Sequence, residues 1–135
     1  SEEFHVMEEK IKEYDIIVPV PISRKRKRER GYNQSLLVAR EISRQLRKYA
    51  NKDLQLVTTS LYKIKNTIEQ SKLNKEDREK NAQGVYELKN RQILKNKNVL
   101  LFDDIYTTGN TANSCCGEIK KAEPNNIGVL VLAKD

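Results

Sequence analysis

The sequence has few of the residues that build redox, metal or nucleophilic sites. Its 135 residues include no tryptophan, two cysteines and one histidine. Cys115 and Cys116 are adjacent, a spacing that fits no zinc or redox motif and that would strain a mutual disulfide. His5 leaves little material for a Ser-His or Cys-His catalytic pair. We therefore expect no structural zinc and two reduced cysteines, small side chains that are buried or half-buried.

Long apolar stretches are also missing. No apolar run approaches the ~20 residues that a membrane-spanning helix needs, and Ser1-Glu2-Glu3 does not open a secretory signal. Hydrophobic residues make up 37% of the chain and charged residues 33%, which is typical of a globular domain in water. The length suits one domain with a real core and is short for two. The sequence therefore predicts a single cytoplasmic domain over residues 1–135, with no membrane segment.

Positive charge, in contrast, is abundant and unevenly distributed. The net charge is +7, and residues 21–50 carry ten Lys/Arg against Glu29 and Glu41. The rest of the chain is therefore close to neutral. Such a concentration favours a polyanionic ligand or partner, either pyrophosphate or nucleic acid.

The most distinctive stretch is an apolar run that ends in two carboxylates. Val99-Leu100-Leu101-Phe102 precedes Asp103 and Asp104, and a turn rich in hydroxyl groups follows them. Such a run predicts a strand buried on both faces of a parallel sheet, and ligands of such sheets lie beyond the carboxyl ends of the strands. Gly109 and its neighbouring threonines predict a phosphate site at the N-terminus of the next helix. The alternative is an ordinary helix cap rich in Asp and Thr.

Residues 99–111 resemble the signature of type I phosphoribosyltransferases. The resemblance implies that Asp103 and Asp104 act at the catalytic centre by binding the ribose hydroxyls of phosphoribosyl pyrophosphate (PRPP). It implies that the same carboxylates bind Mg²⁺, directly or through water or PRPP. It also implies a turn that holds the 5′-phosphate, formed by Thr107, Thr108, Gly109, Asn110 and Thr111.

Apolar periodicity outlines the other elements. Helices are expected at residues 2–14, 36–49 and 111–122. Buried strands are expected at residues 15–21, 54–58, 99–102 and 127–133, with a β-arm at 61–64. Pro19 and Pro21 are expected to stop the first strand and to keep the following backbone from becoming helical. Alternating strands and helices predict an α/β fold with a doubly wound parallel sheet, a Rossmann-like architecture of the type I phosphoribosyltransferase kind.

The basic residues concentrate in the loop predicted at residues 22–34. Its position resembles the pyrophosphate loop of the same transferases, which implies pyrophosphate contacts by Ser23, Arg24 and Arg30. The block Arg30-Gly31-Tyr32-Asn33-Gln34 predicts a shaped turn. The outer basic residues have two alternatives, a solvated charge run or a surface for single-stranded nucleic acid. The candidates for that surface are Lys25, Arg26, Lys27, Arg28 and Tyr32.

The polar segment 65–83 is long enough to act as a flexible lid. The resemblance to phosphoribosyltransferases implies a lid at this position that closes over PRPP and protects a reactive sugar from water. Gln70, Arg78 and Asn81 are the candidates for its contacts to PRPP. The alternatives are a short helix over residues 75–83 and exposed polar residues with no such role.

Four features together resemble the ComF family of competence proteins, also described as amidophosphoribosyltransferase-like. They are the motif Asp-Ile-Ile-Val-Pro-Val-Pro at 15–21, the block at 30–34, Gln70 with Arg78 and Asn81, and the Asp-Asp turn. The family implies a phosphoribosyltransferase fold in bacterial proteins linked to uptake of transforming DNA. Larger members carry an N-terminal four-cysteine zinc module, which the cysteines of this sequence cannot form.

Two main hypotheses of function follow. The first is an enzyme that binds PRPP with Mg²⁺ and transfers the phosphoribosyl group to a nitrogen nucleophile, releasing pyrophosphate. The second is a non-catalytic competence factor that binds single-stranded DNA, works with other competence proteins and retains a PRPP pocket. A regulator controlled by PRPP is a third, with the same fold. Thr107 stands where some purine-salvage members have an aspartate base, so the sequence does not define a purine acceptor. The hood, the subdomain that selects the acceptor base in active transferases, is not evident either, so the sequence does not define the activity. The oligomeric state is also open.

Overall fold

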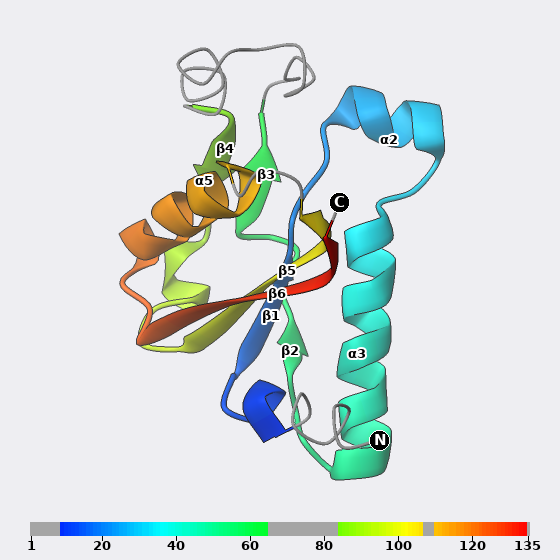
Figure 1. The fold of residues 1–135 in the computed structure, drawn as a ribbon. Coiled ribbons are helices and arrows are strands. Elements are labelled where there is room, and N and C mark those ends of the chain that lie inside the picture. Colours follow the sequence, from blue (N-terminus) through cyan, green and yellow to red (C-terminus); the bar gives the residue numbers. More distant parts are fainter. Residues whose placement is uncertain (1–8, 65–83, 107–109, 135) are drawn as a thin grey trace.

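The computed structural model describes residues 9–64, 84–106 and 110–134 (Figure 1). The strands are β1 (Ile16–Pro19), β2 (Gln55–Leu56), β3 (Leu61–Lys63), β4 (Tyr86–Leu88), β5 (Asn98–Tyr106) and β6 (Asn126–Lys134). The helices are α2 (Arg24–Arg30), α3 (Gln34–Ala50) and α5 (Asn110–Ile119), with short 3₁₀ turns η2 (Arg91–Ile93) and η3 (Lys120–Ala122). Of the helix expected at 2–14, residues 9–14 are described; residues 9–11 are helical and residues 12–14 are not. The expected lid at 65–83 lies outside the described residues.

A four-stranded parallel sheet forms the centre of the fold, in the order β2-β1-β5-β6. Its two inner strands are the most apolar parts of the sequence. Ile17 in β1 and Leu101 and Phe102 in β5 are fully buried. This arrangement confirms the predicted α/β architecture with a doubly wound parallel sheet.

Helices cover both faces of this sheet (Figure 1). On one face, Leu46 of α3 packs in a core cluster with Ile17 and Phe102. On the other face, Cys115 and Ile119 of α5 pack in a second cluster that includes Leu101. We call these the α3 face and the α5 face. Both faces of the inner strands are therefore buried, which explains why their sequences are continuously apolar.

Strand β5 is longer than the apolar run alone predicts. It continues through Asp103 and Asp104 to Tyr106, because β6 pairs with it along this length, for example Asp103 with Val131 and Tyr106 with Lys134. The expectation that the strand ends at Phe102 is therefore wrong. The two carboxylates belong to the last part of the strand and not to the turn after it.

Strand β6 is not buried on both faces, contrary to the prediction. Val129 is 46% exposed and Leu132 is 57% exposed. The sheet order gives the reason: among the described strands, β6 pairs with β5 on one side and with none on the other. An apolar run similar in composition to an inner strand can thus lie at a sheet edge.

The arm predicted at residues 61–64 is confirmed as β3, which pairs with β4 in an antiparallel ladder. Tyr86 and Leu88 of β4 belong to the same core cluster as α5. The backbone N–H of Leu88 also donates a hydrogen bond of 3.2 Å to Oε1 of Glu118 in α5. The arm is therefore attached to the helix that begins beside the acidic strand.

The basic segment after β1 forms helix α2, which corrects the expectation that the prolines keep it from becoming helical. Proline restricts itself and the residue before it, and α2 begins three residues after Pro21, with Lys, Arg and Glu, which are good helix formers. Gly31 ends α2 with φ of +81°, and its N–H donates to the carbonyl of Lys27 at 2.7 Å.

The predicted turn at residues 30–34 is confirmed as the link between α2 and α3. Asn33 is the N-cap of α3, where its side chain accepts a hydrogen bond of 3.3 Å from the N–H of Leu36. Asn33 Nδ2 also donates to the carbonyl of Val20 at 3.3 Å, which ties the start of α3 to the end of β1. No helix in the described part of the chain is long and apolar enough to cross a bilayer.

Candidate functional site

The order of the sheet defines where a ligand should bind. From β1 the chain winds outward to β2 on one side, whereas β5 and β6 lie on the other side of β1. The crevice at the carboxyl ends of β1 and β5 is therefore the switch point of this topology, the place where open α/β sheets bind ligands. Asp103 and Asp104 lie at this end of β5, and the start of α3 lies beside the end of β1.

Asp104 is held from the α3 face by Ser35. The hydroxyl of Ser35 donates to Oδ1 of Asp104 at 2.9 Å, and the backbone N–H of Asp104 donates to the same hydroxyl oxygen at 3.3 Å. Ser35 lies in the first turn of α3 and is 4% exposed. This reciprocal pair fixes both the backbone and the carboxylate of Asp104.

Sequence reasoning did not identify Ser35. A serine in the first turn of a helix is ordinary, and 69 residues separate it from Asp104 in the chain. The signal available was its place directly after the block at 30–34, which starts α3 at the end of β1.

Replacing Ser35 with alanine should weaken binding at the acidic strand and leave the fold intact. The hydroxyl contributes a charge-assisted hydrogen bond, so we expect the affinity for PRPP with Mg²⁺, the ligand that the resemblance implies, to fall about three- to tenfold. Isothermal titration calorimetry measures this change. Ser43→Ala is the matched control, because its hydroxyl bonds the carbonyl of Leu54 at 2.6 Å and no acid. An equal loss in both variants would show that Ser35 does not act through Asp104.

Asp103 lies on the opposite face of β5 from Asp104, because successive side chains of a strand alternate. Its charge acts on Tyr86 and Cys115, both on the α5 face. Burial raises the pKa of the Cys115 thiol, with smaller contributions from Cys116 and from the Asp103 carboxylate. The structure therefore does not direct the two carboxylates to one point. At the carboxyl end of β5, Asp104 lies on the α3 face of the sheet and Asp103 lies on the α5 face.

The hydroxyl of Tyr86 lies between Asp103 in β5 and the start of helix α5. It hydrogen-bonds the side chains of Thr111 and Cys115, and burial, followed by the charge interaction with Cys115, raises its pKa. Thr111 is the described end of the predicted phosphate turn, together with Asn110, whose backbone begins α5; Thr107, Thr108 and Gly109 lie outside the described residues. Tyr86 is a second residue that sequence reasoning missed, since it comes from the distant β3–β4 arm.

The basic candidates form an exposed helix beyond the end of β1. Lys25, Lys27, Arg28 and Arg30 are exposed, and Tyr32 is 47% exposed. Ser23 is buried, and its carbonyl accepts the N–H of Lys27 at 3.0 Å as α2 begins. The backbones of Arg24 and Arg26 belong to α2, and their side chains lie outside the described part. So do the lid candidates Gln70, Arg78 and Asn81.

The cysteines are free thiols, Cys115 buried and Cys116 half-buried, as the sequence predicts. Burial also raises the pKa of Cys116. Among the described residues no group of three His, Cys, Asp or Glu side chains could hold a metal ion. Mg²⁺ usually takes one or two carboxylates together with the phosphates of its substrate, so one of the two acids, Asp103 or Asp104, could serve as its protein ligand.

Known proteins share this sequence and fold. Residues 32–135 match the phosphoribosyl transferase domain family. Competence protein F of Haemophilus influenzae is 32% identical over 124 residues, covering 89% of this chain and 50% of that protein. Competence protein ComFC of Bacillus subtilis is 32% identical over 96 residues, covering 71% of this chain and 34% of that protein. The chain thus spans about half the length, or less, of these relatives.

Solved structures show the same fold at low sequence identity. A hypoxanthine phosphoribosyltransferase from Staphylococcus aureus has a TM-score of 0.57 and 14% identity, with 99% of this chain and 60% of that chain covered. A purine phosphoribosyltransferase from Pyrococcus horikoshii has a TM-score of 0.51 and 19% identity, with 98% and 70% covered. These findings confirm the family predicted from the Asp-Asp turn. The chain belongs to the phosphoribosyl transferase domain family, and its curated relatives are competence proteins of the ComF type.

Proposed function

We propose that this protein binds PRPP with Mg²⁺ at the crevice between β1 and β5 and transfers the phosphoribosyl group to a nitrogen nucleophile, with release of pyrophosphate. The observation that carries the proposal is the placement of Asp103 and Asp104 at the switch point of the sheet, directly before the segment that leads into α5. The membership of the phosphoribosyl transferase domain family supports it.

Each part of the crevice has a task in this reaction. The N-terminus of α5 presents backbone N–H groups and a positive dipole end to the 5′-phosphate. Asp104, oriented by Ser35, accepts hydrogen bonds from the ribose hydroxyls on the α3 face. The cations of α2 stabilise the negative charge of the departing pyrophosphate. Mg²⁺, when bound, would neutralise part of the same charge.

Two measurements test the proposal in sequence. Calorimetry should show PRPP binding that requires Mg²⁺, and pyrophosphate release should follow when ammonia, the simplest nitrogen nucleophile, is added. Absence of PRPP binding would overturn the proposal. Binding without release in the presence of ammonia and of a panel of amines would favour the regulator or the DNA-binding factor over the enzyme.

Helix α2 supports a second candidate function, the binding of single-stranded DNA. The described basic side chains of α2, those of Lys25, Lys27, Arg28 and Arg30, are exposed, and the half-exposed ring of Tyr32 follows directly after Gly31. Exposed cations beside an accessible aromatic ring suit a strand whose phosphates are neutralised while a base stacks. The resemblance to competence proteins is consistent with this role.

Neutralising Lys25, Arg26, Lys27 and Arg28 with glutamine should flatten the salt dependence of single-stranded DNA binding. The log–log slope should become shallower by about 0.7 for each phosphate that the protein no longer neutralises. Fluorescence anisotropy at several salt concentrations measures the slope. The control replaces four lysines with glutamine at the amino ends of the strands, opposite the end at which α2 lies: Lys52 before β2, Lys95 and Lys97 before β5, and Lys120 after α5. If both variants show the same slope, α2 does not bind DNA.

A further inference from the structure

Lys63 is a cation on the inner face of the β3–β4 arm, the face that packs against α5 (Figure 1). Side chains alternate along a strand, so Lys63 shares a face with Leu61, which belongs to the core cluster of the α5 face. In the antiparallel ladder Lys63 is opposite Tyr86, and its Nζ lies 6.0 Å from the centre of the Tyr86 ring. A lysine that is half-buried beside a core is unusual, because lysines are mostly exposed.

Two further interactions place the Lys63 ammonium group near the start of α5. The hydroxyl of Tyr86 hydrogen-bonds the side chains of Thr111 and Cys115, which both belong to α5. Burial is the main cause of the raised pKa of the Cys115 thiol; the carboxylate of Asp103 raises this pKa further, whereas the ammonium of Lys63 lowers it. The charges of Lys63 and Asp103 therefore both act on the first turns of the helix that we assign to the 5′-phosphate.

The part of the chain assigned to the 5′-phosphate has no cation of its own. Residues 98–119, from the start of β5 to the end of α5, include three acids and no Lys or Arg. A phosphate monoester carries a charge of about −1.5 to −2 near pH 7, and a helix N-terminus supplies about +0.5. A phosphate bound after Asp103 and Asp104 therefore needs a cation from another part of the chain, and Lys63 is placed to supply it.

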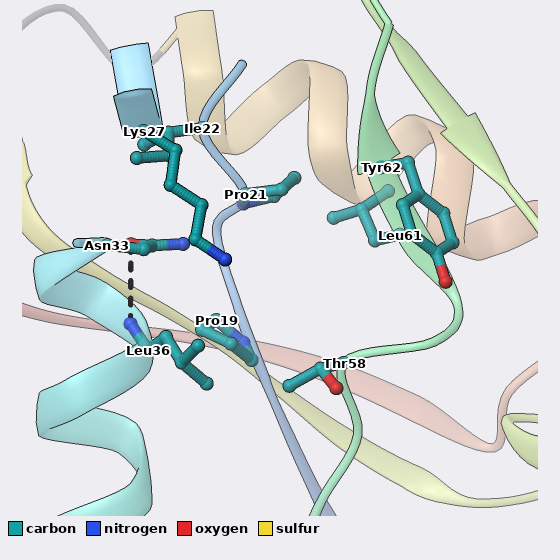
Figure 2. A pocket seen from close by; sticks show the side chains of 9 residues that line it. All are labelled: Pro19, Pro21, Ile22, Lys27, Asn33, Leu36, Thr58, Leu61 and Tyr62. Atoms are coloured by element: carbon teal, nitrogen blue, oxygen red, sulfur yellow. Dashed lines mark hydrogen bonds between the residues drawn. The ribbon is translucent and has the colours of Figure 1, made fainter. Parts of the chain in front are cut away.

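The basic helix α2 lies on the other side of the arm from α5 (Figure 1). Tyr62, whose side chain alternates with that of Lys63, borders a cleft that Lys27 of α2 and Pro19 of β1 also line (Figure 2). This cleft follows β1 and belongs to the region assigned above to pyrophosphate. The two anionic ends of PRPP would thus meet different cations, because the arm separates α2 from Lys63.

We propose that Lys63 binds the 5′-phosphate of PRPP through its ammonium group and thereby makes the site selective for a phosphorylated sugar. This inference rests on the proposed function. The flexible stem of lysine lets Nζ move from the Tyr86 ring toward an anion at Thr111, whose side chain bonds the hydroxyl of the same ring. The ammonium group then donates a charge-assisted hydrogen bond to a phosphate oxygen.

Ribose 5-phosphate and pyrophosphate divide PRPP into its two anionic halves and therefore test where Lys63 acts. Calorimetry with Mg²⁺ should show that Lys63→Met weakens the binding of ribose 5-phosphate about three- to tenfold. The affinity for pyrophosphate should change by less than about twofold, because methionine keeps an apolar stem on the arm. Lys63→Arg should restore most of the affinity for ribose 5-phosphate, since arginine restores the charge.

Lys89→Met is the matched control. Nζ of Lys89 lies 5.0 Å from the centre of the Tyr62 ring, so this variant also removes one charge and one cation–π contact from the arm. Its affinity for ribose 5-phosphate should stay within about twofold of the unmodified protein. The α2 variant with four glutamines should show the reverse of Lys63→Met, with weaker binding of pyrophosphate and little change for ribose 5-phosphate.

The outcomes separate this inference from the proposed function. Equal losses for the two ligands in Lys63→Met, or equal losses of ribose 5-phosphate affinity in Lys63→Met and Lys89→Met, overturn the inference, because a general effect on the arm would produce them. Ribose 5-phosphate that does not bind, or that binds Lys63→Met normally, also overturns it while PRPP binding stands. If ribose 5-phosphate binds through Lys63 but PRPP does not bind, Lys63 is upheld as a sugar-phosphate ligand and the proposed function is overturned.

Discussion

The Asp103→Asn/Asp104→Asn protein should bind PRPP with Mg²⁺ at least about 100-fold more weakly than the unmodified protein. Both substitutions keep the shape of the side chain and remove its negative charge, so the ribose hydroxyls lose charged acceptors and the metal loses its carboxylate partners. Calorimetry at fixed Mg²⁺ measures the change. The fold should persist, because the amide oxygen that replaces the carboxylate of Asp104 can still accept the hydrogen bond of Ser35.

A control must remove the same charge without touching the crevice. Glu87→Gln/Glu123→Gln serves this purpose, because Glu87 is an exposed residue of β4 and Glu123 an exposed residue after η3. Its PRPP affinity should stay within about twofold of the unmodified protein, since exposed charges are screened. If the Asp103/Asp104 variant behaves like this control, the acidic strand is not the PRPP site.

The single variants test the opposed orientation of the two acids. Asp104 is fixed by Ser35 on the α3 face, whereas Asp103 lies near Tyr86 and Cys115 on the α5 face. Loss of the Ser35 hydroxyl should therefore weaken PRPP binding strongly in the Asp103→Asn protein and less in the Asp104→Asn protein, where the hydrogen bond that Ser35 donates to the amide oxygen is no longer charge-assisted. An equal effect in both backgrounds would mean that Ser35 supports the site as a whole and not one carboxylate.

Apolar pattern predicted the sheet well, because a parallel strand buried on both faces leaves little freedom in its sequence. The apolar runs that form β1 and β5 were recognised as strands for this reason. The same reasoning failed at β6, whose run is equally apolar although Val129 and Leu132 are exposed. Burial of an edge strand depends on which neighbours the fold supplies, and local composition does not contain that information.

The miss at α2 has a different cause. Six basic residues within seven suggested mutual repulsion and a loop, and the prolines before them strengthened that view. Helix propensity and the stop at Gly31 outweighed both, because the four described cations of α2 are exposed and water screens them. The missed site residues Ser35 and Tyr86 lie far from the Asp-Asp turn in sequence, so only the packing of α3 and of the β3–β4 arm brings them to it.

Gly128→Ala should destabilise the fold by about 1–3 kcal/mol, because the added methyl group has no room. A Cβ at this position would overlap Oη of Tyr14 and lie 2.6 Å from its Cζ. Gly128 pairs with Leu100 in the sheet, and Tyr14 packs against the core cluster of the α3 face. The phenol of Tyr14 thus occupies the space that a side chain of β6 would take.

Urea unfolding followed by circular dichroism measures this destabilisation, and Gly117→Ala provides a control of opposite sign. Gly117 lies within α5, and a Cβ there would meet nothing within 4 Å. Alanine at that position should stabilise the protein by about 0.5–1 kcal/mol, because glycine is a poor helix former. A comparable loss of stability in both variants would show that the contact with Tyr14 is not the cause.

Removing the ring of Tyr14 isolates the contact. Tyr14→Ala alone should destabilise the protein, since the ring packs against the α3-face cluster. In the Tyr14→Ala background the methyl group at Gly128 has space, so the additional destabilisation from Gly128→Ala should fall below about 0.5 kcal/mol. Because β6 pairs with β5 from Asn98 to Tyr106, the clash in the single variant should also displace the strand that carries Asp103 and Asp104. PRPP binding should then fall in Gly128→Ala and recover in the Tyr14→Ala/Gly128→Ala protein. If the affinity for PRPP stays weak in the double variant, the loss comes from the change in β6 itself and not from the collision with Tyr14.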